Sequence, residues 1–165
     1  MDILIPYATL SGKRRVLLFV LLSLLLLNLA VIFGSSLMSP EASGESSSAV
    51  GDFLESVLPE GTPTTDFILV NLRKIAHFAE FAALGAITAL LILGFAKKPL
   101  KVAPVSPIFG LVTGFTDETI QIFSGRGPDV CDVWIDLFGY LFSTVLIILT
   151  YIILALIRKR RKKGK

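Results

Sequence analysis

Ionisable side chains gather near the ends of apolar segments, where they could bind a ligand or do chemistry. They lie in two stretches, 71–81 and 117–136, which combine one histidine with basic residues and carboxylates. A charge inside a bilayer costs about 2.5 kcal/mol or more, so a membrane segment keeps one only if it is paired, hydrated or used. The candidate ligand-binding residues are Arg73, Lys74, His77, Glu80, Asp117, Glu118, Gln121, Arg126, Asp129, Asp132 and Asp136.

These residue types suit three kinds of chemistry. His77 with a carboxylate partner could act as a general acid and base, and Glu80, Asp117 and Glu118 are the other catalytic candidates, with no role assigned. The cations would then hold an anionic group such as a phosphate or a carboxylate. His77 and Glu80, at i and i+3, could instead bind a divalent metal together with later carboxylates. This spacing is a weak signal, so a metal is the less favoured cofactor hypothesis.

The composition indicates a membrane protein. The chain has 165 residues, 53% of them hydrophobic, and a mean hydropathy of +0.76. That length leaves no room for a soluble domain beside membrane segments, so one domain is expected. Cys131 is the single cysteine, which excludes an internal disulfide and a paired-cysteine metal site.

Four apolar runs predict an all-α integral membrane bundle of four transmembrane helices. The runs cover 16–37, 75–96, 102–123 and 133–157, and each approaches the roughly 20 residues that cross the hydrocarbon core. The first run could also be a secretory signal peptide, because three basic residues precede it. It is long for the roughly 7–15 apolar residues of such a signal, so a retained anchor is favoured.

The distribution of basic residues predicts the orientation. They gather before the first run, between the second and third, and after the fourth, which places both termini of a multi-pass membrane protein in the cytoplasm. The basic tail, 158–165, is interpreted as an anchor to lipid headgroups and not as a nucleic-acid site. The chain is thus predicted to have four parts. They are the N-terminus with the first anchor (1–38), an external loop (39–66), a three-helix core (67–157) and this tail (158–165).

The segment 39–66 is expected to lie outside the membrane and to combine a loop with a short helix. Its serine-rich first part, 39–48, has the composition of a flexible loop. Residues 50–58 place apolar side chains at helical spacing, which predicts a short amphipathic helix on the outer surface. Thr64, Thr65 and Asp66 are candidate N-caps for the second span.

Helical spacing and the predicted topology bring the polar residues together. On each of the last three spans they share one face and lie at the external end. Three polar stripes therefore meet near the outer surface, while the inner halves of the spans hold almost nothing ionisable, which argues against an ion or proton relay.

Purely structural roles are the alternative for these residues. Arg73 and Lys74 could reach toward the membrane interface, Asp129 could cap the fourth span, and salt bridges could simply fix helix register. Small residues continue two stripes, at Gly110, Gly114, Gly139 and Ser143, and the first pair could pack within one chain or between chains.

The same motifs resemble the VanZ-like family of bacterial membrane proteins, over roughly 71–140. The resemblance leaves the first span and the external loop outside, and Asp136 stands where the family often has Asn. It implies a location in a bacterial plasma membrane, a cell-envelope context and a link to teicoplanin-type antibiotic resistance, with no established catalytic residues to carry over. It rests on Lys74, His77, Phe78, Glu80, Phe81, Leu84, Gly85, Asp117, Glu118, Gln121, Phe123, Arg126, Asp129, Asp132 and Gly139.

Three functional hypotheses follow. The first is a membrane protein whose outward-facing polar site binds an envelope molecule, either a lipid-linked wall precursor or a glycopeptide. The second is an enzyme that acts on an anionic polyprenyl or phospholipid headgroup through His77 and a carboxylate. The third is a scaffold whose ion pairs are purely structural. The expected partners are membrane lipids and no nucleic acid, and the sequence leaves the oligomeric state open.

Overall fold

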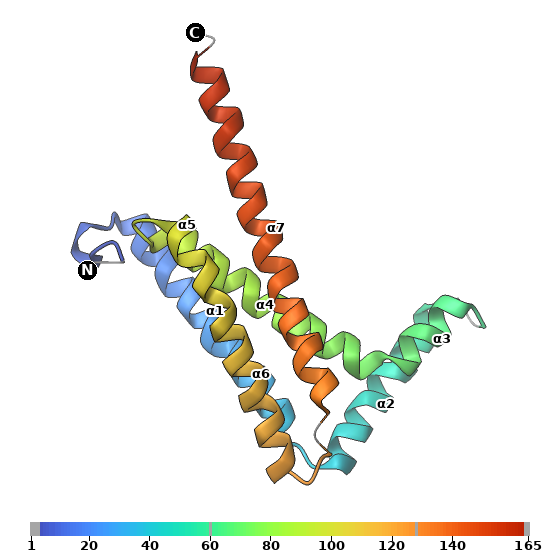
Figure 1. Ribbon diagram of the computed structural model, residues 1–165. Coiled ribbons are helices and arrows are strands. Elements are labelled where there is room, and N and C mark those ends of the chain that lie inside the picture. The colour runs from blue at the N-terminus through green and yellow to red at the C-terminus, as the bar shows by residue number, and fades with distance from the viewer. Residues whose placement is uncertain (1–3, 60, 128, 164–165) are drawn as a thin grey trace.

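The computed structural model describes residues 4–59, 61–127 and 129–163, and this part of the chain folds as helices without a β-strand. The all-α prediction is therefore confirmed. Four long helices form the body of the molecule (Figure 1). They are α1 (Gly12–Ser36), α4 (Leu72–Phe95), α6 (Ser106–Phe123) and α7 (Val130–Lys163). The shorter elements are η1 (Tyr7–Thr9), α2 (Pro40–Val57), α3 (Pro63–Val70), α5 (Pro99–Val102) and η2 (Ala103–Val105).

Three helices in the described part of the chain are long and apolar enough to cross a membrane: α1, α4 and α7. Even α4, with 24 residues, spans roughly 36 Å at 1.5 Å per residue. Their outer surfaces are apolar, and Phe19 and Leu26 of α1 are 73% and 68% exposed. Such surfaces suit contact with lipid. The run expected as the third span, 102–123, is divided among α5, η2 and α6, and α6 does not meet the same criteria.

The long helices alternate in direction (Figure 1). The backbone N–H of Ile5 bonds the carbonyl of Phe95 at 2.9 Å, and Arg14 bonds the carbonyl of Gly94 at 3.1 Å, so α1 starts where α4 ends. The α2–α3 hairpin lies at the other end of the bundle. We call this end, where α1 and α6 finish and α4 and α7 begin, the polar end. The opposite end, where α1 starts and α4 finishes, is the basic end.

Glycines allow α4, α6 and α7 to approach closely around Tyr140, whose side chain is fully buried. A Cβ atom built on Gly110 would lie 2.6 Å from the Tyr140 ring, closer than real contacts allow. Cβ atoms on Gly85 and Gly139 would overlap the carbonyl oxygens of Tyr140 and Phe78. The small-residue face of α6 thus packs on α7 within one chain, which resolves the alternative that the sequence left open.

The segment expected as a flexible loop, 39–48, is helical, so that expectation was wrong. Ser39 caps α2, because its hydroxyl accepts the backbone N–H of Ala42 at 3.3 Å, and Pro40 follows in the first turn, where it is well tolerated. The amphipathic helix expected over 50–58 is the second half of this longer helix. None of its residues is buried, so capping supplies the order that burial does not.

The second expected span also begins differently. Thr62 caps the separate helix α3, with the Thr65 backbone N–H donating to its hydroxyl at 3.2 Å. The N-cap roles expected of Thr64, Thr65 and Asp66 were therefore wrong. The chain passes from α3 to α4 at Asn71, and α4 starts at Leu72, three residues before the predicted span.

Candidate functional site

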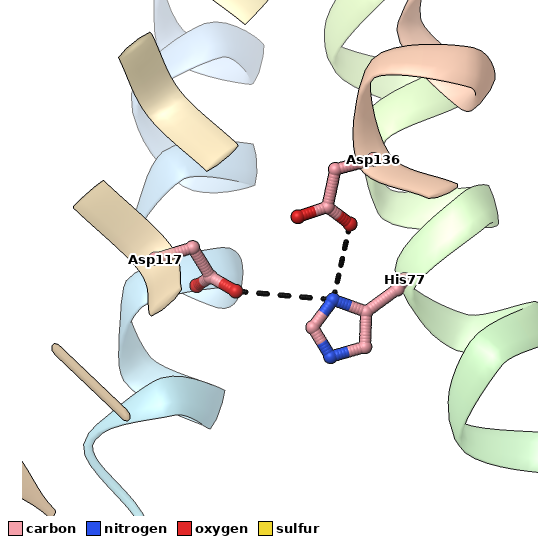
Figure 2. A group of neighbouring side chains, drawn as sticks. All are labelled: His77, Asp117 and Asp136. Carbon is pink, nitrogen blue, oxygen red and sulfur yellow. Dashed lines mark hydrogen bonds and ion pairs between the residues drawn. The ribbon is translucent and has the colours of Figure 1, made fainter. Parts of the chain in front are cut away.

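Three buried ionisable side chains meet at the polar end, each from a different helix. Figure 2 shows His77 of α4 facing Asp117 of α6 and Asp136 of α7. The His77 Nδ1 atom lies 3.1 Å from Oδ1 of Asp136 and 3.8 Å from Oδ2 of Asp117. The two carboxylates are 0% and 1% exposed, and His77 is 7% exposed. We call these three residues the buried triad.

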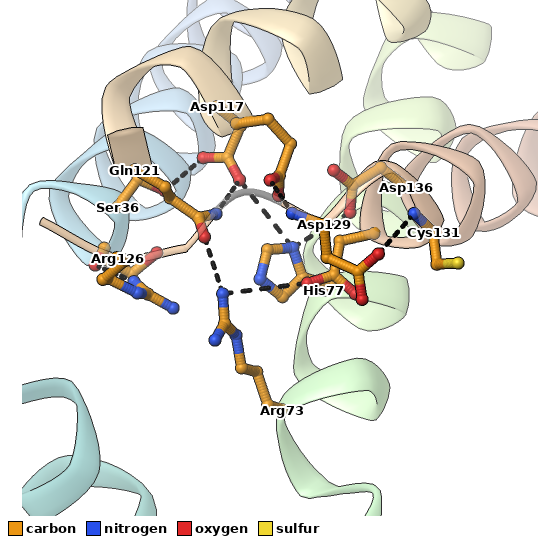
Figure 3. A network of polar contacts seen from close by, with 12 residues as sticks. Ser36, Arg73, His77, Asp117, Gln121, Arg126, Asp129, Cys131 and Asp136 are labelled. Carbon is orange, nitrogen blue, oxygen red and sulfur yellow. Dashed lines mark hydrogen bonds and ion pairs between the residues drawn. The ribbon is translucent and has the colours of Figure 1, made fainter. Parts of the chain in front are cut away.

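Two neutral side chains hold Asp117 in place (Figure 3). The Ser36 hydroxyl, at the end of α1, donates a hydrogen bond to Oδ1 of Asp117. The Gln121 amide, one turn further along α6, donates to Oδ2 at 2.9 Å. These bonds stabilise the ionised carboxylate and fix its orientation without adding positive charge.

The two arginines near the triad have other partners. Arg73 donates to the Gln121 carbonyl oxygen at 2.6 Å and lies 3.7 Å from Asp132. Arg126, which is 9% exposed, donates to the backbone carbonyl of Ser35 at 3.0 Å. The turn before it places Gly125 at φ +80°, a conformation that glycine adopts without strain. Both guanidiniums keep further N–H groups for a ligand, since each carries five donors.

A cavity of about 170 Å³ opens beside the triad, between α2 and the bundle. Its polar lining combines two guanidiniums, one imidazole and one carboxylate with serine side chains of α2. Four of the sequence-predicted residues contribute to it. The lining residues that carry this chemistry are Ser43, Ser46, Ser47, Arg73, His77, Glu80 and Arg126.

Other predicted residues lie outside this cavity. Lys74 is exposed and does not line it, although it neighbours Arg73 in sequence. Asp129 is also exposed, and its carboxylate accepts the Cys131 backbone N–H at 2.8 Å at the start of α7. This hydrogen bond keeps the pKa of Asp129 below its usual range and is typical of an N-cap. Glu118 bonds the backbone N–H of Asp129 at 3.0 Å and so secures the turn before α7.

The structure also selects among the potential metal ligands. In the described part of the chain, ligand atoms of His77, Asp117 and Asp136 all lie within 4.8 Å of one another. Glu80, which the i, i+3 spacing paired with His77, does not belong to this group. The helix α4 directs His77 toward α6 and α7, whereas Glu80 lines the cavity. The structure thus groups His77 with Asp117 and Asp136 and leaves Glu80 outside this group.

Several residues of this region escaped sequence reasoning. Ser35 and Ser36 were not among the predicted site residues, yet they contact Arg126 and Asp117. Asn28, an isolated polar residue in the apolar α1, donates to the carbonyl of Glu80 at 3.3 Å. Its position inside an apolar run was the available signal, because a membrane helix rarely keeps an amide without a partner. The serines of α2 gave no signal beyond low complexity.

Comparison with known protein families places the chain in one of them. The VanZ/LLP1 family model matches residues 16–154. The chain belongs to the VanZ/LLP1 family. Searches of the curated proteins and of the solved structures gave no match.

The extent of the VanZ/LLP1 match corrects one expectation. The resemblance was expected to leave out the first span and the external segment, but the family model begins at residue 16 and so includes most of α1 and all of α2. The contact of Ser36 with Asp117 gives a physical reason, because α1 supplies part of the polar end. Family membership and three apolar helices together support a membrane protein.

Proposed function

We propose that this VanZ/LLP1 protein spans a bacterial plasma membrane four times, with both termini in the cytoplasm and the polar end outside. The alternating directions of α1, α4, α6 and α7 support four crossings, with α6 as the most polar one. Lys97, Lys98 and Lys101 lie at the basic end, as the positive-inside rule requires of a cytoplasmic face. Arg73, Lys74 and Arg126 belong instead to the polar end.

The function that this arrangement supports best is binding of an anionic headgroup of a cell-envelope lipid. The observation that carries the proposal is the cavity with Arg73, Arg126 and His77 in its lining. Guanidiniums bind phosphate oxygens through paired, charge-assisted hydrogen bonds, and the α2 serines add neutral donors. A lipid ligand fits the position of this site near the ends of apolar helices. A polyprenyl phosphate or a lipid-linked wall precursor has the required chemistry.

Binding to purified protein in lipid nanodiscs tests this proposal. The probe is a polyprenyl phosphate, and the polyprenol of the same chain length is the neutral comparison, each measured with and without a chelator. We expect the phosphate to bind at least tenfold more tightly. Arg126→Gln and Arg73→Gln should each weaken phosphate binding about tenfold or more, since a hydrogen bond to a charged group contributes about 1.5–3 kcal/mol.

Lys74→Gln is the matched control, because it removes an adjacent cation that does not line the cavity. Its phosphate affinity should remain near that of the wild type. Equal binding of phosphate and alcohol, or an equal loss in Lys74→Gln and Arg126→Gln, would show that the cavity is not an anion site. Melting temperatures measured in parallel separate lost binding from lost folding, and Arg126→Lys should retain part of the affinity.

A contribution to teicoplanin-type resistance would follow if the bound molecule is a wall precursor or the glycopeptide itself. In cells that express the protein at matched membrane abundance, Arg126→Gln should then change teicoplanin susceptibility and Lys74→Gln should not. Unchanged susceptibility in both variants would separate headgroup binding from resistance.

The alternative function is an enzyme that acts on the same headgroup. It is favoured by one observation: His77 lines the cavity while its Nδ1 faces Asp136, an arrangement that orients an imidazole for general acid–base catalysis. The nanodisc preparation tests this too, by measuring release of inorganic phosphate from polyprenyl phosphate and diphosphate. Phosphate release that His77→Gln abolishes would establish an enzyme, and its absence with and without added metal would leave binding as the function.

A further inference from the structure

The buried triad holds more negative charge than its neighbours balance. Asp117 and Asp136 are almost completely buried, and one imidazole stands between them. Arg126 is bonded to the Ser35 carbonyl and Arg73 to Gln121, so neither guanidinium has a hydrogen bond to Asp136. Buried carboxylates without sufficient positive charge are costly, and proteins compensate by protonation, by a partner or by a metal ion.

One atom of the triad shows this imbalance directly. The Oδ2 atom of Asp136 is buried and has no hydrogen-bond partner. Its carboxylate belongs to the group whose ligand atoms lie within 4.8 Å of one another. A buried, unpartnered oxygen beside a second carboxylate and an imidazole provides the donors that a cation needs. An acidic cluster alone would not indicate a ligand, but this orphaned oxygen does so independently.

The distances suit a first-row transition-metal dication. Two ligand atoms on one such ion lie roughly 3–3.5 Å apart when each bond is about 2.1 Å long. The His77 Nδ1 atom is 3.1 Å and 3.8 Å from its two carboxylate neighbours, and the three ligand atoms lie within 4.8 Å of one another, so side-chain rotations that draw them together would complete the geometry. The hydrogen bonds from Ser36 and Gln121 already orient Asp117, as outer partners of metal ligands do.

We propose that His77, Asp117 and Asp136 bind a divalent transition-metal ion, with Zn²⁺ or Mn²⁺ as the best chemical match. One imidazole nitrogen with two carboxylates suits these ions, whereas Mg²⁺ and Ca²⁺ prefer oxygen ligands alone. The cavity that His77 lines provides the route of entry and room for water as a further ligand. The two proposed sites share only His77, because the other metal ligands are Asp117 and Asp136 and the other headgroup ligands are Arg73 and Arg126.

Metal titration of the purified full chain tests this inference. The protein is prepared without a histidine tag, stripped with EDTA and titrated with Zn²⁺, Mn²⁺ and Mg²⁺ in the absence of any phosphate lipid. We expect about one equivalent of Zn²⁺ or Mn²⁺ per chain, with Mg²⁺ at least tenfold weaker. Bound metal should raise the melting temperature by several degrees, since a ligand that binds only the folded state stabilises it. A wild-type protein that binds neither Zn²⁺ nor Mn²⁺ would overturn the proposal.

Variants locate the ion. Asp136→Asn and Asp117→Asn should each lower metal affinity at least tenfold. Asp136→Asn should also leave the metal-free protein as stable as the wild type or more so, because it removes a buried charge. Asp129→Asn is the matched control, since it changes an exposed carboxylate to a residue that caps helices equally well, and its metal affinity should be unchanged. Wild-type affinity in Asp136→Asn would overturn the assignment.

A measurement on the wild type avoids dependence on variants that fail to fold. His77 is the only histidine of the chain. Addition of Co²⁺ should therefore give one paramagnetically shifted imidazole N–H signal, which Zn²⁺ displaces. Bound Co²⁺ without such a signal would place the ion elsewhere and reject the site. The metal titration contains no phosphate lipid, so a protein that binds no metal would leave the headgroup proposal unaffected. Lipid binding measured in the presence of a chelator tests the headgroup proposal separately.

Discussion

The hydroxyl of Ser36 donates a hydrogen bond to the carboxylate of Asp117, which lies 81 residues later in the chain. Both residues are almost completely buried. The bond joins the end of α1 to the polar face of α6, and it makes the first helix part of the candidate site. It also connects the site to stability, because Asp117 has few other neutral donors.

Removal of this hydroxyl should destabilise the protein. Ser36→Ala leaves Oδ1 of Asp117 without its donor, and an unsatisfied buried group of this kind costs about 1–3 kcal/mol. Thermal unfolding in detergent should show a melting temperature several degrees lower. Ser35→Ala is the matched control, since its hydroxyl bonds only Ile32 within its own helix and its backbone carbonyl still accepts Arg126. Equal melting temperatures for Ser36→Ala and the wild type would contradict the contact.

The close approach of α6 to α7 depends on Gly110. A methyl group there would meet the Tyr140 ring, so Gly110→Ala should force the helices apart and cost about 1–3 kcal/mol of stability. Gly94→Ala is the comparison, because a Cβ atom at Gly94 has no neighbour within 4 Å. Thermal melts should show a loss for Gly110→Ala and little change for Gly94→Ala. The reverse order would mean that α6 does not pack on α7 in this way.

The orientation of the protein can be read from its single cysteine. Cys131 is exposed at the start of α7, at the polar end. If this end faces outward, a membrane-impermeant maleimide should label Cys131 in intact bacterial cells. In the Cys131→Ser background, Lys162→Cys near the end of α7 should react only after the cells are permeabilised. Labelling of Lys162→Cys but not of Cys131 in intact cells would invert the proposed topology.

Local sequence was sufficient for the class of fold. Apolar runs of about 20 residues favour helices in a membrane, because every backbone N–H and C=O must bond within the segment. The all-α architecture and the family follow from such patterns together with the motifs around His77 and Asp117, and both are confirmed. Four crossings, the orientation and the role of the site remain predictions, since among the residues that the structure describes three helices have the length and apolarity of a span.

The prediction from composition was wrong for segment 39–48, where an N-cap stabilises a helix despite the low helix propensity of serine. The serine-rich segment 39–48 looked flexible because serine favours helices only weakly. Ser39 and Pro40 nevertheless start a helix there, and the serines on one of its faces line the cavity. Local sequence patterns do not place these hydroxyls in one cavity with Arg73 and Arg126, because that placement depends on how α2 lies relative to the start of α4.

The sequence by itself determined which residues carry charge, which segments are apolar and at which ends of those segments the polar residues lie, because these properties depend on residue type and short-range spacing. Only the tertiary structure decided that His77 faces Asp136 and Asp117 while Glu80 lines the cavity, that Asp129 serves as a cap, and that Ser36 completes the site. The physical reason is that a contact between helices depends on the rotation and separation of both partners. Those quantities are set by packing across the whole bundle, as the approach of Gly110 to Tyr140 shows.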